Sequence, residues 1–315
     1  MTDSPSLTEL LEVQKHFALP STALVEKDWH VIRAMQAVSR VDAAPFRLVF
    51  AGGTCLARAH KLVQRMSEDV DFKVVPNETT PRSASKLRQQ LGALRDRITA
   101  SLQEAGFPVE PGTATAIRSR DANRYTIYQL TATPSGSADS HLRPTLQVEL
   151  SYADLRLPSI DLPVSSFVSE AYGRPPEIRA MACASVTETA AEKLVSLTRR
   201  TAMELAGKGR ASDPTLLRHI YDLHTIRDHT DQATAVALAR EIAIADAEEF
   251  ANQHPAYRAD IAAETHKALA HLRNDPEVRA RYERFVAAMV YGERSDFIDA
   301  IMTMTHLAEE AWPRR

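Results

Sequence analysis

Two adjacent glycines, followed closely by a strand with two aspartates, constrain the fold of this chain more than any other feature. Gly52 and Gly53 lack a Cβ, so the backbone there can turn tightly and approach an anion closely. Thr54 stands where the next helix is predicted to begin, with its free N–H groups and the positive end of its dipole. Asp69 and Asp71 are two positions apart, which places both carboxylates on one face of a strand. The pattern predicts an anion-binding turn beside a carboxylate-bearing strand.

This combination is typical of a site for Mg²⁺ and a nucleoside triphosphate. Asp69 and Asp71 would hold one or two Mg²⁺ ions, which bridge phosphate oxygens and orient an attacking hydroxyl. Ser67 precedes Asp69 by one strand step on the same face, so its hydroxyl could reach a phosphate. An isolated Asp-x-Asp is more often a pair of solvated acids on an edge strand. The Gly-Gly-Thr turn upstream favours the metal site.

A third acid is expected from a neighbouring strand. Residues 145–152 alternate between apolar and polar side chains, as a half-buried strand does. Glu149 lies on the polar face and is a candidate third Mg²⁺ ligand, or the general base that deprotonates the acceptor hydroxyl. A solvent-facing acid on a half-buried strand explains this position equally well. If the three carboxylates converge, their repulsion raises their pKa values unless a cation is present, so Mg²⁺ would be part of the site.

The composition is that of an ordinary globular protein, and it excludes several classes. The chain has 315 residues and a net charge of −3, so any surface for nucleic acid has to be local. Its two cysteines, Cys55 and Cys183, predict neither a disulfide framework nor a metal cluster, and both are expected to be buried. No signal peptide or membrane-length apolar run is evident, so a cytoplasmic location without membrane association is expected. P-loop, kinase, nucleophile-elbow and His-Glu-x-x-His motifs are missing.

The order of predicted elements indicates an α+β (mixed α/β) protein of two domains. Residues 1–184 are expected to form a core with a small mixed sheet flanked by helices. Residues 185–315 are expected to form a helical domain, because the sequence becomes Ala- and Leu-rich and almost wholly helical there. The predicted helices of the first domain span residues 6–18, 21–40, 54–63 and 83–105. The predicted strands span residues 47–50, 69–75, 125–131 and 145–152, with short strands within 158–182.

The glycine turn and the Asp-x-Asp strand together resemble the signature of the nucleotidyltransferase superfamily. Within that signature, the run Arg65-x-Ser67-Glu68-Asp69-Val70-Asp71 is similar to the Arg-Phe-Ser-Glu-Asp-Ile-Asp run of the AbiEii/AbiGii (MenT-like) toxin family. The resemblance implies a nucleotidyltransferase fold in which Asp69 and Asp71 are metal ligands and catalytic residues. It also implies that the nucleotide is bound by Gly52, Gly53, Thr54, Arg65 and Ser67.

Two helical motifs further along the chain extend the resemblance. Glu192-Lys193-Leu194 is similar to the Glu-Lys helix of the toxin family. Arg218-His219-Ile220-Tyr221-Asp222-Leu223 is similar to its Arg-His-Tyr-Tyr-Asp-Leu motif, with Ile220 in place of an aromatic residue. The family pattern implies that Lys193 neutralises triphosphate charge and that Asp222 positions Lys193 or the nucleotide. The residues alone also allow an exposed cationic stripe at Lys193, and a local Arg218–Asp222 ion pair worth only ~0.3 kcal/mol.

Two further positions are assigned no catalytic role. His219 has no second His at ligand spacing, so it is expected to be a structural or hydrogen-bonding group. Glu26-Lys27-Asp28-Trp29 matches the Glu-Lys-Asp-aromatic helix of the family, with Trp29 expected in the core.

The resemblance implies the toxin of a type IV toxin–antitoxin or abortive-infection pair, with a cognate antitoxin as partner. Such a toxin would transfer a nucleoside monophosphate from a nucleoside triphosphate, expected to be CTP or GTP, to an acceptor hydroxyl and release pyrophosphate. Mg²⁺ is the expected cofactor, the 3′ end of tRNA the leading acceptor, and a monomer the expected state. Cations around Lys208 and Arg210 fit a local contact with RNA phosphates. A protein acceptor and a non-catalytic nucleotide-binding module remain alternatives.

Overall fold

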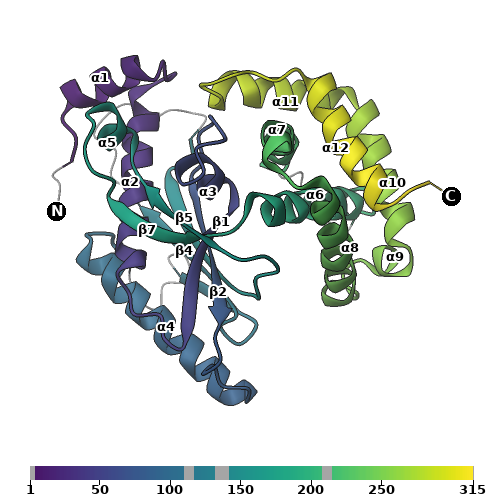
Figure 1. Cartoon of the computed structure of the whole chain (residues 1–315), viewed down its shortest axis with the longest axis horizontal. Helices are drawn as coiled ribbons and strands as arrows, with labels where there is room; N and C mark the ends of the chain where they lie inside the picture. Colours follow the sequence, from purple (N-terminus) through teal and green to yellow (C-terminus); the bar gives the residue numbers. More distant parts are fainter. Residues whose placement is uncertain (1–3, 110–116, 132–141, 208–214, 315) are drawn as a thin grey trace. The chain divides into compact units, whose positions relative to one another are not determined.

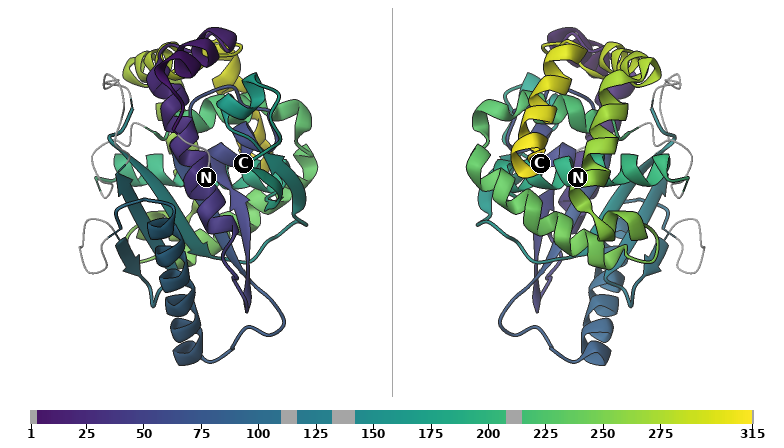
Figure 2. Two further views of the ribbon diagram at one scale, coloured as in Figure 1. Left: turned by 90° about the vertical axis from the view of Figure 1, so that its left-hand side faces the viewer. Right: turned by 90° about the vertical axis from the view of Figure 1, so that its right-hand side faces the viewer.

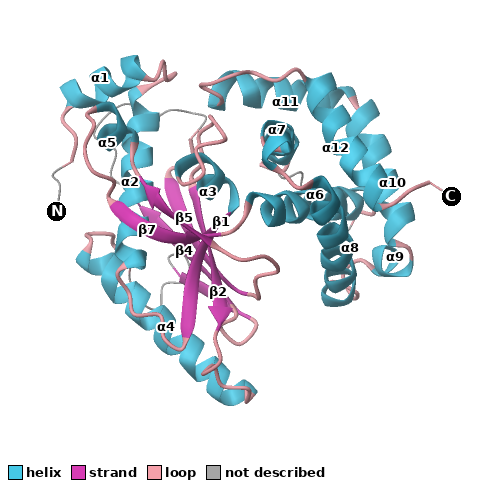
Figure 3. Cartoon of the chain, in the orientation of Figure 1, coloured by secondary structure: helices cyan, strands magenta, loops and turns pink. Residues whose placement is uncertain are grey.

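The computed structural model describes residues 4–109, 117–131, 142–207 and 215–314. The chain divides into two compact units, Met1–Ala184 and Ser185–Arg315. The first unit combines a sheet with helices, whereas the second is built from helices (Figure 3). The chain is therefore a mixed α and β protein, as the order of its predicted elements indicated.

A seven-stranded mixed sheet forms the centre of the first unit (Figure 1). Its strands are β1 Phe46–Ala51, β2 Asp69–Pro76, β3 Ile117–Arg120, β4 Tyr125–Thr131, β5 Thr145–Tyr152, β6 Ile160–Val164 and β7 Ile178–Cys183. The strand order is β3-β4-β5-β2-β1-β7-β6. In the middle, β2 is parallel to β5 and antiparallel to β1. This order makes β2 and β5, the two strands with candidate site acids, direct neighbours.

Two long helices, α2 Thr22–Ser39 and α4 Ala84–Glu104, cover one face of this sheet (Figure 2). Their apolar residues recur at helical spacing and join the buried side chains of the strands in one hydrophobic core. Val70 and Phe72 of β2 belong to this core, so Asp69 and Asp71 face the other way. The remaining helices of the unit are α1 Leu7–His16, α3 Gly52–Arg58 and α5 Phe167–Ala171.

The helix after the glycine turn is shorter than predicted, since α3 ends at Arg58 instead of continuing to residue 63. Lys61 has a φ of 57°, a left-handed conformation that glycine or asparagine usually supplies at helix ends. The N–H of Leu62 then turns back to the carbonyl oxygen of Leu56, which satisfies a carbonyl group that the helix end leaves open. Because a lysine occupies the left-handed position, the sequence carries no recognisable stop signal.

The second unit contains α6 Val186–Leu205, α7 Arg218–Thr225, α8 Gln232–Glu249, α9 Pro255–Ala259, α10 Ile261–Asn274, α11 Pro276–Met289 and α12 Phe297–Ala311. Helix α6 packs against α8 and α10, and α7 packs against α12. Five of these helices begin with a Ser or Asp side chain that accepts a backbone N–H of the first turn. The capping residues are Ser185, Asp231, Asp260, Asp275 and Asp296.

Candidate active site

Strand β2 presents Asp69 and Asp71 on the face of the sheet opposite the apolar core. Val70 and Phe72 are buried, which confirms the predicted alternation of the strand. In the parallel pairing of β2 with β5, Asp71 stands in register with Glu149. Residues in register on neighbouring strands point to the same face of a sheet. The three candidate acids therefore lie on one face of two adjacent strands.

The two glycines allow the turn to pack directly on two site side chains. Gly52 has a φ of 73°, and a Cβ there would lie 2.1 Å from Oδ2 of Asp71. A Cβ on Gly53 would lie 2.4 Å from Nη2 of Arg65. A residue with a side chain would thus be strained at position 52 and would displace the Asp71 carboxylate.

Two buried side chains, Thr54 and Arg65, support the backbone around the turn. The hydroxyl of buried Thr54 donates to the carbonyl oxygen of Asp69 and lies 2.8 Å from the hydroxyl of Ser67. Thr54 therefore links the start of α3 to the start of β2. Arg65 is also buried and donates from Nη1 to the carbonyl oxygen of Met66 at 2.9 Å. Its burial favours support of the turn over the predicted contact with nucleotide, whereas Ser67 is only half-buried.

Glu149 is held by a tyrosine from the neighbouring strand β4. Oη of Tyr125 donates to Oε2 of Glu149 at 2.6 Å. Burial raises the pKa of Glu149 above its ordinary value of 4.5; the bond from Tyr125 opposes this shift, and the charge of Asp69 reinforces it. A carboxylate whose pKa moves toward neutrality is better matched to accepting a proton in catalysis.

Asp69 has a cationic partner that sequence reasoning missed. Arg143, two residues before β5, donates from Nη2 to Oδ1 of Asp69. The backbone N–H of Arg143 donates to Oε1 of the buried Glu68 at 2.8 Å. Lys27 of α2 lies 3.6 Å from that same oxygen and donates to the carbonyl oxygens of Arg143 and Thr145 at 2.7 and 3.0 Å. Lys27 belongs to the Glu-Lys-Asp segment of α2, to which the sequence assigned no role. It therefore positions the backbone around Arg143 next to Asp69.

Asp28 gives the same segment a second anchoring function. Its carboxylate lies 2.8 Å from Nε of Arg58, at the end of α3, and accepts the N–H of Phe167 at 2.7 Å. Burial raises the pKa of Asp28 to about 6, although the Arg58 charge acts against the shift. Helix α2 thereby fixes both α3 and α5. Trp29 is buried, as predicted.

In the second unit, Lys193 and Asp222 form a buried ion pair between α6 and α7. Nζ of Lys193 lies 2.8 Å from Oδ2 of Asp222, whose side chain is 0% exposed. Because Lys193 is buried, its interpretation as part of an exposed stripe is wrong. Nζ also lies 3.3 Å from Nδ1 of His219. An ammonium group only donates, so Nδ1 accepts, and His219 is the hydrogen-bonding group that was expected.

The acids on β2 and β5 include the candidate metal ligands. Among the described residues, no three His, Cys, Asp or Glu side chains come together as a metal-binding group. The role of Glu149 as a third ligand therefore stays a prediction. Asp69 and Asp71 nevertheless fit Mg²⁺, which in nucleotide sites takes only one or two protein carboxylates together with phosphate oxygens and water.

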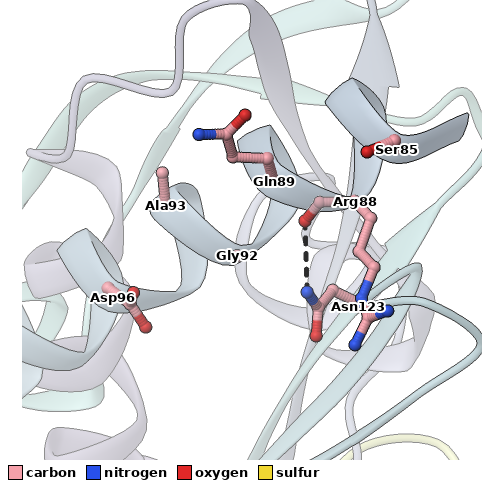
Figure 4. Close-up of a pocket in the computed structure, with 7 residues that line it drawn as sticks. All are labelled: Ser85, Arg88, Gln89, Gly92, Ala93, Asp96 and Asn123. Carbon is pink, nitrogen blue, oxygen red and sulfur yellow. Dashed lines mark hydrogen bonds between the residues drawn. The ribbon is translucent and has the colours of Figure 1, made fainter. Parts of the chain in front are cut away.

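A cavity of about 430 Å³ lies along α4, and its lining includes none of the predicted site residues (Figure 4). The side-chain amide of Asn123 donates there to the carbonyl oxygen of Arg88 at 3.2 Å. Asp121, Ala122 and Asn123 all have positive φ values. The bond therefore anchors the unusual turn between β3 and β4 on α4, and we assign this cavity to the packing of that hairpin.

Exposed cations lie on the same sheet face as the candidate acids. Arg118 and Arg120 of β3 are exposed and stand in register with Ile127 and Tyr125 of β4. Those β4 residues pair in turn with β5, where Ile127 is in register with Glu149. Two cations predicted to contact RNA lie outside the described residues: Lys208 and Arg210.

The chain matches a model of one known protein family over most of its length. The family model for "Nucleotidyl transferase AbiEii toxin, Type IV TA system" matches residues 33–304. The chain belongs to this family. The matched range includes β2, β5 and the Lys193–Asp222 pair. The protein is accordingly a nucleotidyltransferase of a toxin family, with a nucleoside triphosphate as substrate and an antitoxin as partner.

The similarity to a solved structure is weaker evidence than the family match. Among solved structures, the chain is similar to MenT4, a nucleotidyltransferase toxin from Mycobacterium tuberculosis H37Rv. The match has 20% identity and a TM-score of 0.48, and it covers 75% of this chain and 70% of that chain. No curated protein matched the sequence. Within the part of the chain that is described, no helix has the length and apolar character needed to cross a membrane.

Proposed function

We propose that this AbiEii-family protein transfers a nucleoside monophosphate from CTP or GTP to the 3′-terminal hydroxyl of tRNA, in a Mg²⁺-dependent reaction that releases pyrophosphate. The observation that carries the proposal is the placement of Asp69 and Asp71 on one face of β2, with Glu149 in register beside Asp71. The glycine turn supports it, because Gly52 lets the backbone close directly over the Asp71 carboxylate.

Each acid has a distinct part in the proposed chemistry. Asp69 and Asp71 supply oxygen ligands to Mg²⁺, which when bound offsets phosphate charge and makes the α-phosphorus easier to attack. Glu149 takes the proton of the acceptor hydroxyl, a role that its raised pKa supports. The acceptor oxygen then bonds to the α-phosphorus. The bond from that phosphorus to the bridging oxygen breaks, and pyrophosphate leaves.

Two further groups are proposed to act on the phosphates. The half-buried hydroxyl of Ser67 donates a hydrogen bond to a phosphate oxygen. Lys193 contributes a positive charge to the triphosphate, and Asp222 keeps its ammonium group in place through the 2.8 Å contact.

The chain as a whole has a net charge of −3, so support for a polyanionic acceptor has to come from a local group of positive charges. Arg118 and Arg120 are exposed on the sheet face that carries Glu149. Guanidinium groups match phosphate oxygens in both charge and geometry, so two of them on the same sheet face as the acids favour an RNA backbone over a neutral acceptor.

The proposal is tested by incubating purified protein with Mg²⁺, total tRNA, total cell protein and each α-³²P-labelled nucleoside triphosphate in turn. We expect label in tRNA from CTP or GTP, and loss of that label in Asp69→Asn and Asp71→Asn. Asp161→Asn is the matched control, because Asp161 is an exposed acid on the edge strand β6. It should keep wild-type labelling.

The alternatives have their own outcomes in the same experiment. Label that enters protein instead of RNA would establish a protein acceptor. Nucleotide binding without label in any fraction would favour the non-catalytic module. Labelling that survives in Asp69→Asn would contradict the role of this carboxylate as a metal ligand.

A further inference from the structure

A buried scaffold fixes the backbone that carries Arg143. Glu68, with a side chain that is 0% exposed, accepts the backbone N–H of Arg143. Lys27 donates to the carbonyl oxygens of Arg143 and Thr145 in the same peptide segment. Donors and acceptors of one short segment are thus satisfied by two buried charged side chains, so its position beside β2 is strongly determined.

The guanidinium group at the end of this scaffold is held at one end and more exposed at the other. Its Nε lies 3.6 Å from Oε2 of the buried Glu68, whereas the contact of Nη2 with Asp69 joins side chains that are 37% and 27% exposed. Ion pairs at this exposure are weakened by water and salt. The Lys27 and Glu68 side chains are only 7% and 0% exposed, so their interaction is screened much less. The backbone of Arg143 and the Nε end of its guanidinium are therefore fixed near Glu68, while the more exposed Nη2 end can exchange Asp69 for another anion.

A divalent cation and this guanidinium compete for the same carboxylate. Nη2 of Arg143 donates a hydrogen bond to Oδ1 of Asp69, and Asp69 is one of the two acids that fit Mg²⁺. Two cations at one carboxylate repel each other, so metal binding disfavours the Arg143 contact. A triphosphate bound to that metal brings several anionic oxygens close to Asp69. The planar guanidinium group can donate two parallel hydrogen bonds to such oxygens.

We propose that Arg143 is a nucleotide-binding residue that rests on Asp69 in the free protein and moves to the triphosphate when metal and nucleotide bind. The inference rests on the proposed function, because it requires Asp69 to bind a divalent cation beside a nucleotide. Lys27 and Glu68 are then positioning residues, which act through the backbone of Arg143. The contact also gives Asp69 a counter-ion whenever no metal is bound.

The proposal predicts opposite effects of one substitution on two affinities. Arg143→Gln removes the competing charge, so Mn²⁺ alone should bind about three- to tenfold more tightly than to wild type. The same variant loses a phosphate contact, so CTP or GTP with Mg²⁺ should bind about tenfold or more weakly. Arg143→Lys keeps the charge without the fork, and should change nucleotide affinity more than Mn²⁺ affinity. Titration calorimetry measures each affinity without any turnover.

Arg95→Gln is the matched control, since Arg95 forms a 2.8 Å pair with Asp96 and its side chain is 32% exposed. It should leave both affinities at wild-type values. If Arg143→Gln weakens both affinities, Arg143 only supports the site, and if it changes neither, Arg143 is a bystander; either result overturns the proposal. Wild-type protein that binds no nucleotide overturns both this inference and the proposed function. Opposite shifts without label transfer to any acceptor would overturn the proposed function alone.

Discussion

A methyl group at position 52 would collide with a carboxylate on which the proposed site depends. The Cβ of Gly52→Ala would lie 2.1 Å from Oδ2 of Asp71. The φ of 73° at this position is also one that residues with a side chain rarely adopt. We expect the free energy of unfolding to fall by about 3 kcal/mol. Displacement of Asp71 should also lower nucleotidyl transfer by about 100-fold. Urea denaturation and initial rates of labelling measure the two effects.

Gly173→Ala separates the collision from the backbone strain. Gly173 also has a positive φ, of 60°, but a Cβ there meets nothing within 4 Å. This variant should lose about 1 kcal/mol and keep its activity. Equal losses of stability and activity in both variants would show that contact with Asp71 is not what position 52 requires.

The buried ion pair between α6 and α7 is expected to stabilise the packing of these two helices. Asp222→Asn leaves the buried ammonium group of Lys193 without its carboxylate at 2.8 Å. We expect a loss of about 3 kcal/mol or more in the free energy of unfolding, because an uncompensated buried charge is costly. Glu283→Gln, which breaks the exposed Arg279–Glu283 pair on α11, should give no measurable change.

A double variant then separates stability from catalysis at this pair. Lys193→Met combined with Asp222→Leu replaces both buried charges by apolar groups and should recover most of the stability lost in Asp222→Asn. If Lys193 acts on the triphosphate, the recovered protein remains inactive in the labelling experiment. Recovery of stability together with activity would reduce the Lys193–Asp222 pair to a structural link.

Elements with strong local patterns were predicted well, and those without them were not. The predicted ranges 125–131 and 145–152 coincide with β4 and β5. Burial alternates along both strands, and in β5 the sequence itself alternates between apolar and polar residues. Strand β3 was missed because it has four residues, three of them exposed. Helix α3 was extended too far because Lys61, rather than glycine, takes the left-handed position after it.

The stability of the whole molecule should depend on pH through His30 of α2. Burial lowers the pKa of His30 from 6.5 to about 4. The unfolded chain therefore binds a proton at a higher pH than the folded chain does. The stabilisation is complete above pH 6.5 and is lost as the pH falls toward about 4. Between about pH 7.5 and pH 5, wild type should lose on the order of 1 kcal/mol more than His30→Gln does.

The difference between variants is the informative quantity, because Asp28 titrates in the same range with opposite sign. The pKa of Asp28 is raised from 3.8 to about 6, so the folded chain binds its proton first and gains stability as the pH falls through that range. This contribution is common to wild type and His30→Gln and cancels in the comparison. His229→Gln, at an exposed position, should track wild type at both pH values. Parallel curves for wild type and His30→Gln would contradict the prediction.

The sequence by itself determined the local features of the site. Alternation placed Asp69, Asp71 and Glu149 on polar strand faces, and the glycine pair located the turn. These features depend on a few neighbouring residues, so a single sequence displays them. The same reasoning found the Lys193 and Asp222 motifs through a resemblance, but it could not show that both side chains are buried.

Only the tertiary structure decided which charged groups meet. Arg143 lies 74 positions from Asp69 in the chain, and Lys27 lies 116 positions from Arg143. Their contacts follow from the parallel pairing of β2 with β5 and from the packing of α2 near the start of β5. No spacing in the sequence encodes such contacts, because they depend on how the strands are ordered in the sheet and not on the residues that flank each charge.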